Sequence, residues 1–118
     1  MIQRELEELL NNEICKMYKR WVGKGPKYIK TRIFEDIIVV RFEKYDEPLF
    51  TKLSETEMGR ELMKSMSERI FKLSKNELIK VVESIIECNV KKVYLDAQNI
   101  DGEMALTITC KKNILLED

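Results

Sequence analysis

The chain has 118 residues, of which 44% are hydrophobic and 36% charged, and its 21 basic and 21 acidic side chains leave no net charge. This composition is typical of a globular protein with a heavily charged surface, and the length suits a single domain spanning 1–118. The chain has no histidine, which excludes Ser-His and Cys-His nucleophile systems and removes the commonest zinc ligand. No apolar run approaches the ~20 residues that cross a bilayer, so we expect a cytoplasmic protein and not an integral membrane protein.

Apolar residues at three- and four-residue steps predict one amphipathic helix from Ile2 to about Val22. They are Leu6, Leu9, Leu10, Ile14, Met17, Tyr18 and Trp21. Gly23 stands where a left-handed residue commonly closes a helix, and Pro26 prevents a restart. Gly25 gives the chain freedom to reverse, so we interpret Gly23, Gly25 and Pro26 as a structural turn. A phosphate-binding loop is not favoured, because this turn precedes a strand and not a helix.

A basic band without acidic residues runs from Ile14 to Phe34. Its members are Lys16, Lys19, Arg20, Lys24, Lys27, Lys30 and Arg32. Such a band could attract phosphates, nucleic acid or an anionic membrane surface. Together with Tyr18, Trp21 and Tyr28 it has the composition of a single-strand nucleic-acid platform, although helical spacing favours a core position for Tyr18 and Trp21. The alternative, which we favour, is that the band is solvated or faces the acidic residues of a second copy.

Two strands are predicted next, over Tyr28–Phe34 and Ile37–Glu43, from their aromatic and β-branched residues. The two residues between them predict a tight hairpin. The segment 37–40 is apolar on both faces, so we expect the second strand to be central and covered on both sides. Arg41 is either an exposed strand end or a buried partner of a carboxylate, and the pattern allows both.

A connector over 45–52 leads to Ser54, which with Glu57 has the Ser-x-x-Glu form of a capping box and predicts a helix start near residue 55. A second box, Ser74 with Glu77, predicts two helices with a break near 72–75. One continuous helix of about thirty residues is the alternative.

A second hairpin is predicted over 90–98 and 103–111, with its turn at 99–102. Cys110 alternates with apolar residues, which indicates a core thiol, and the odd, widely spaced cysteines indicate reduced thiols. Asp96 in a strand either ends the regular ladder or is a functional acid.

The element order is therefore α-β-β-α-α-β-β, which predicts an α+β fold with a four-stranded antiparallel sheet, built of two hairpins, and helices packed on it. The first helix and the strand from Ile37 carry more apolar surface than one small layer can hide. We therefore expect a homodimer formed through these two elements.

The chain contains Gly23-Lys24-Gly25-Pro26, the hairpin with Asp36 and Ile38-Val39-Val40-Arg41, and Leu53 followed by Glu57-Met58-Gly59-Arg60. Together these motifs resemble those of the MpsC-like family. Its members are small bacterial proteins, named after a component of a sodium-translocating, membrane-potential-generating system linked to bicarbonate supply. The chain has Phe50 where the family pattern has a glutamate. The resemblance implies a cytosolic accessory of membrane energetics or inorganic-carbon uptake, and it supplies no catalytic residues.

These observations together predict a non-enzymatic accessory or regulatory protein that docks onto a partner, with no metal or cofactor; that partner could be a subunit of a membrane transport complex. The alternative is a protein that binds nucleic acid or an anionic ligand through the region from Gly23 to Arg32; an enzyme using carboxylates alone is the least favoured class. The candidate binding residues are Lys24, Lys27, Lys30, Arg32, Arg41 and Arg60.

Overall fold

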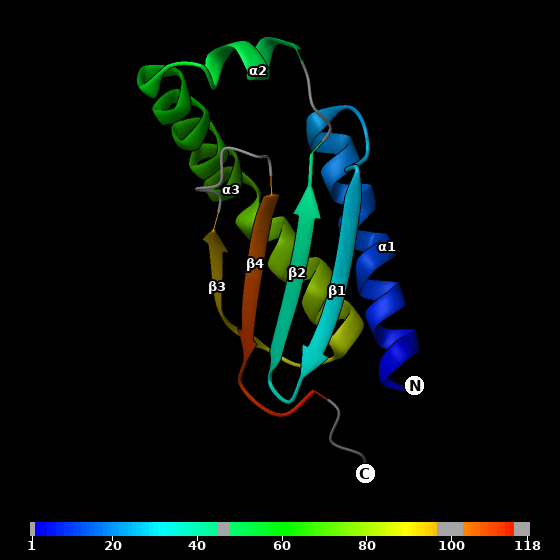
Figure 1. The fold of residues 1–118 in the computed structure, drawn as a ribbon. Helices are drawn as coiled ribbons and strands as arrows, with labels where there is room; N and C mark the ends of the chain where they lie inside the picture. Colours follow the sequence, from blue (N-terminus) through cyan, green and yellow to red (C-terminus); the bar gives the residue numbers. More distant parts are fainter. Residues whose placement is uncertain (1, 45–47, 97–102, 115–118) are drawn as a thin grey trace.

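A computed structural model describes residues 2–44, 48–96 and 103–114, in which α1 and α3 pack on one face of a four-stranded sheet (Figure 1). The elements in chain order are α1 (Gln3–Val22), β1 (Tyr28–Phe34), β2 (Ile37–Glu43), α2 (Pro48–Leu53), α3 (Glu57–Ile86), β3 (Val90–Asp96) and β4 (Glu103–Cys110). The strands lie in the order β1-β2-β4-β3, and every neighbouring pair is antiparallel. The predicted α+β class, element order and pair of hairpins are confirmed.

Helix α1 buries its apolar stripe against the sheet, with Leu6, Leu10, Ile14 and Met17 in the core. Gly23 ends it in the left-handed conformation, at φ 95°, and donates its N–H to the Lys19 carbonyl at 2.9 Å. The predicted helix and its closing glycine are confirmed. Most of the stripe is buried within the monomer, while Leu9 and Trp21 remain 36% and 39% exposed.

The start of α1 is fastened to the free edge of β1 by polar contacts. An edge strand leaves alternate N–H and C=O groups without a partner strand. The Ile33 N–H donates to Glu7 Oε2 at 2.8 Å, and Gln3 Nε2 donates to the Ile33 carbonyl at 2.9 Å. Asn11 adds a third contact, accepting from the Thr31 hydroxyl at 2.9 Å. Two side chains of α1 thus occupy the backbone groups that another strand would use.

The first hairpin has the predicted boundaries. Phe34 pairs with Ile37 across a turn in which Glu35 adopts a positive φ of 56°. Strand β2 is central, as predicted, and its residues 38, 40 and 42 are buried beneath the helices. Ile37 and Val39 point to the other face and are only half-buried, because no described element covers that face. The expectation that β2 is covered on both sides is therefore wrong.

The region between the hairpins begins with a short helix, α2, where a connector was predicted. Helix α3 starts two residues later than the sequence indicated. Its N-cap is Thr56, whose hydroxyl accepts the Gly59 N–H at 2.9 Å, while the Ser54 hydroxyl binds the Thr51 carbonyl. A Cβ at Gly59 would lie 1.8 Å from the Leu53 carbonyl oxygen, so this close corner between α2 and α3 requires glycine.

Helix α3 is continuous from Glu57 to Ile86, so the predicted break near 72–75 is wrong and the single-helix alternative is correct. Ser74 does not cap a new helix. Its hydroxyl donates to the Ile70 carbonyl at 2.7 Å, one turn back within the same helix, and the residue is buried against α1 and the sheet. Glu77 reaches out to α1 instead of back to Ser74.

The second hairpin completes the core. Leu106, Ile108 and Cys110 of β4 are buried, as predicted from their alternation, and Val93 of β3 joins them. Strand β3 is described to Asp96, where its ladder with β4 ends in the described part of the chain. The predicted turn over 99–102 lies outside the described residues.

We expect Glu7→Ala to lower the free energy of unfolding by about 1–3 kcal/mol, because it leaves the Ile33 N–H buried without an acceptor. Urea denaturation followed by circular dichroism measures this. Glu8→Ala is the matched control: Glu8 is one residue along, highly exposed, and pairs with exposed Arg4 at 3.7 Å. It should cost less than about 0.5 kcal/mol. Equal losses in the two variants would contradict the role given to Glu7.

Gly23→Ala should cost about 1–2 kcal/mol, because alanine is strained at φ 95° although no atom lies within 4 Å of the added Cβ. Gly25→Ala is the control: its added Cβ also meets nothing within 4 Å, and it needs no positive φ. The same denaturation experiment should find Gly25→Ala close to neutral. A neutral result for both changes would show that the left-handed closure of α1 is not a constraint.

Candidate functional site

The sheet face opposite the helices, which we call the open face, carries the outward-pointing residues of all four strands. Helix α3 passes behind the strands in Figure 1, and no described helix lies in front of them. The open face is made of Tyr28, Lys30, Arg32 and Phe34 on β1, Ile37, Val39, Arg41 and Glu43 on β2, Glu103, Ala105, Thr107 and Thr109 on β4, and Lys92, Tyr94 and Asp96 on β3.

Three of the predicted binding residues meet on this face. Lys30 and Arg41 are register partners on β1 and β2, and Arg32 is the next outward residue of β1. Arg41 is exposed and also paired, because its Nη2 lies 2.8 Å from Oε1 of Glu103. The hydrogen bond and the charge of Glu103 raise the pKa of the Arg41 guanidinium. Arg41 therefore has one property from each of the two alternatives drawn from the sequence: it is exposed on the surface, and it pairs with a carboxylate.

The other predicted binding residues lie elsewhere. Lys24 and Lys27 are in the exposed loop between α1 and β1, where the Lys27 N–H extends the ladder by donating to the Glu43 carbonyl at 2.8 Å. Arg60 is on α3, and its Nη1 donates to the Ser54 carbonyl at 2.8 Å. This contact holds the corner between α2 and α3 together. The basic band is therefore divided between a helix, a loop and one face of a strand.

The open face also exposes aromatic rings that the sequence did not single out as a set. Phe34 is 68% exposed, Tyr94 is 51% exposed and Tyr28 is 42% exposed. Tyr94 lies in the same cross-strand row as Arg32, with Val39 and Thr107 between them. Strand alternation could have revealed these exposed rings, since it places Phe34 on the same face of the strand as Lys30 and Arg32 and not in the core.

Charges of both signs are interspersed on the open face. Its cations are Lys30, Arg32, Arg41 and Lys92, and its carboxylates are Glu43, Glu103 and Asp96. The carboxylates lie towards one end of the strands. Glu43 and Glu103 share a cross-strand row with Tyr28, and Asp96 shares the next row with Arg41. The surface is therefore not a uniformly basic one of the kind that tracks a polyanion.

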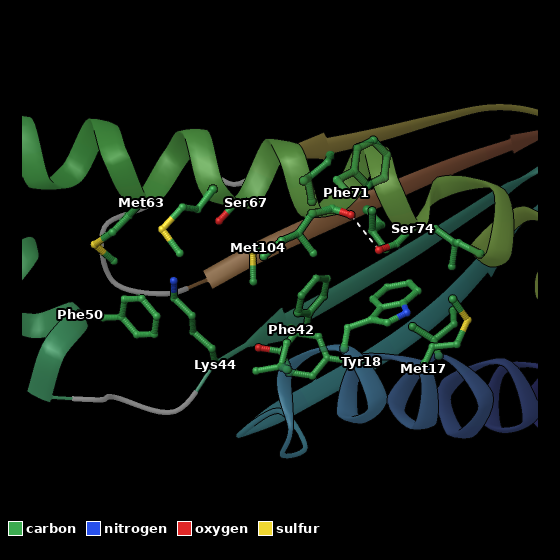
Figure 2. Close-up of a pocket in the computed structure, with 18 residues that line it drawn as sticks. Met17, Tyr18, Phe42, Lys44, Phe50, Met63, Ser67, Phe71, Ser74 and Met104 are labelled. Carbon is green, nitrogen blue, oxygen red and sulfur yellow. Dashed lines mark hydrogen bonds between the residues drawn. The ribbon is translucent and has the colours of Figure 1, made fainter.

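A concave feature lies on the helix side of the sheet, where α1 and α3 diverge over the end of the strands (Figure 2). This apolar groove has a volume of about 170 Å³. Its lining comes from α1, the inner face of the sheet and α3, and it includes Met17, Trp21, Phe42, Met66 and Phe71. The Tyr18 and Phe42 rings meet edge to face at 5.5 Å, and Lys44 lies 5.0 Å from the centre of the Phe50 ring near the mouth.

Glu77 of α3 connects the two helices beside this groove. Its Oε1 accepts from Arg20 Nη2 at 2.5 Å, and its Oε2 accepts from Trp21 Nε1 at 3.1 Å. Tyr18 packs on the core as its spacing predicted, whereas Trp21 is 39% exposed and serves as a donor to α3.

The described residues contain no group of three or more His, Cys, Asp or Glu placed to hold a metal ion. Over the described ranges, no helix is long and apolar enough to cross a membrane.

Comparison with known proteins gives one result. The family model described as Na+-translocating membrane potential-generating system (MpsC) matches residues 2–112. No curated protein and no solved structure matches. The matched range includes the whole sheet, α1 and α3.

Thiol reactivity should follow burial. Burial raises the pKa of the Cys110 thiol from 9.0 to about 11, so at pH 8 it stays protonated and inaccessible. In the native protein a disulfide reagent should modify half-buried Cys15 well before Cys88 and Cys110, and all three should react in denaturant. Because the folded state holds the Cys110 proton more tightly, its contribution to stability is complete below pH 9 and is lost as the pH rises towards 11. Equal native rates would contradict this assignment.

Proposed function

Because the chain belongs to the MpsC family, we propose that it is a cytoplasmic, non-enzymatic accessory or regulatory protein of a membrane-potential-generating, cation-translocating system. It acts by docking onto another protein of that system, and the open face is its docking surface.

The observation that carries this proposal is the composition of the open face. Exposed aromatic rings and arginines are the side chains most enriched at the centres of protein interfaces. Here Phe34 and Tyr94 stand on a rigid sheet beside half-buried Ile37 and Val39, with charged residues around them. A rigid strand scaffold needs little ordering on binding, which favours affinity.

Two features support a role without catalysis. The chain has no histidine to act as a general base near neutral pH. The polar side chains of the open face lie in rows on an exposed sheet and not in a cavity that excludes water, whereas catalytic groups work best in enclosed sites.

A second candidate function, binding of single-stranded nucleic acid, rests on the same face. Tyr28, Phe34 and Tyr94 could stack on bases, and Lys30 and Arg32 could contact phosphates. The loop residues Lys24 and Lys27 would add to the electrostatic attraction. We favour the protein partner, because three carboxylates share the face and one of them neutralises Arg41.

The test is a pull-down from solubilised membranes of the native host with the tagged full chain. The double change Phe34→Ala and Tyr94→Ala should weaken capture of a membrane-protein subunit at least tenfold, as expected for interface anchors. Leu49→Ala is the control, since Leu49 is 67% exposed on α2, away from the open face. Capture that is unchanged in the double variant would contradict docking through this face.

Fluorescence anisotropy with a labelled single-stranded oligonucleotide decides between the two candidates. Binding that falls steeply with salt, and that is lost in the same double variant, would favour nucleic acid and contradict the protein partner.

A further inference from the structure

The first half of α3 presents a row of large apolar side chains to solvent. Their exposed fractions are 81% for Met58, 51% for Leu62, 39% for Met66, 44% for Ile70 and 86% for Leu73. We call these five residues the α3 stripe. Fully burying a large apolar side chain contributes roughly 1.5–3 kcal/mol to stability. In a monomer these five side chains lose much of that contribution, because they stay exposed to water.

The α3 stripe lies on a different side of α3 from the residues that pack the helix into the core. Four-residue steps from Met58 lead to the buried residues Leu78, Val82 and Ile86, but each step turns a further 40°, so Met66 and Val82 lie about 160° apart around the helix. Each residue turns about 100° around a helix, so Lys64 and Glu68 lie on the side opposite the middle of the stripe. The exposed half of α3 is thus amphipathic, with its apolar face prepared for packing.

This half of the helix extends beyond the ends of β3 and β4 (Figure 1). From Glu57 to Leu73, Gly59 is the residue of α3 that is buried. The molecule measures 53 × 22 × 21 Å, and its radius of gyration is 15.1 Å, against about 13–14 Å for a compact chain of this length. A helical segment of this length is marginal in water without tertiary packing.

We propose that a second copy of the chain covers the α3 stripe, with the two α3 helices antiparallel about a two-fold axis near Met66. The charged residues beside the stripe favour this arrangement. Glu61 and Lys72 are eleven residues apart, about three turns, so they lie on one line along the helix. The midpoint between them falls beside Met66, which is also the middle of the stripe.

An antiparallel copy centred there places the Glu61 of each helix opposite the Lys72 of the other, so each chain gives one acid and one base to the interface. A surface that is complementary to itself in this way is what a two-fold dimer requires. The same copy also closes the apolar groove, since Met66 and Ile70 belong both to the stripe and to the groove lining. The groove is therefore incomplete in the monomer.

A membrane surface is a poorer occupant of the stripe. Helices that lie in the bilayer interface carry a polar face rich in Lys and Arg. This half of α3 instead mixes three acids, Glu57, Glu61 and Glu68, with four bases, Arg60, Lys64, Arg69 and Lys72. The inference is independent of the docking role given to the open face, which lies on the other side of the sheet.

Light scattering on the full chain tests the proposal. Wild type should have about 28 kDa, twice the 14.0 kDa of one chain, at micromolar concentration, and Leu62→Glu should shift it to the monomer mass while the cooperative urea-unfolding transition of the core is retained. Phe34→Glu is the matched control, because it places the same charge at an exposed apolar site on the open face, and it should remain dimeric. A monomeric wild type, a dimeric Leu62→Glu, or a monomeric Phe34→Glu would each overturn the proposal.

Charge exchange tests the antiparallel arrangement with changes that leave the apolar residues intact. Glu61→Lys and Lys72→Glu should each weaken the homodimer about tenfold, because two attractive pairs become repulsive. Mixing these two single variants should restore a dimer containing one of each chain, and the double exchange in one chain should restore the homodimer. Failure of the mixture to associate better than either variant alone would contradict the arrangement.

Discussion

The docking of α1 on the edge of β1 is the interaction on which the rest of the structure depends. Glu7 and Gln3 bind both outward backbone groups of Ile33, so a helix occupies the place where another strand would add. At the opposite edge, Glu83 of α3 accepts the Val90 N–H at 2.8 Å. Both helices are thereby committed to the same face of the sheet. The other face remains open because the described residues contain no further element that could cover it.

The parts of the fold that depend on local sequence could be predicted, and the parts that depend on tertiary contacts could not. The boundaries of the first hairpin follow from alternation and a turn of Glu35 and Asp36, which act within a few residues. The start of α3 depends instead on the close approach of Gly59 to the Leu53 carbonyl. Likewise, the serine of the second capping box sits inside a continuous helix, where its hydroxyl binds a carbonyl of the preceding turn.

The candidate site shows the same division. Lys30 and Arg32 could be chosen from the sequence because they lie in one basic band, and strand alternation does place them together. Their carboxylate neighbours Glu43 and Glu103 arrive through the β2 and β4 pairings, one of which joins residues far apart in the chain. A linear band therefore overstates how basic the folded surface is. Its net character is decided by cross-strand neighbours that no local pattern contains.

Helix α3 passes through two environments without a break in its backbone hydrogen bonds. Beyond Ser74 its apolar side chains are held by the sheet and by α1, whereas before Ser74 a second apolar side of the helix meets water. The free energy needed to open a backbone amide should therefore fall along the helix from Ile86 towards Glu57, so that the two halves belong to different cooperative units. Whatever packs on the first half also completes its folding. At this end of the molecule, association and the ordering of a helix are a single thermodynamic event.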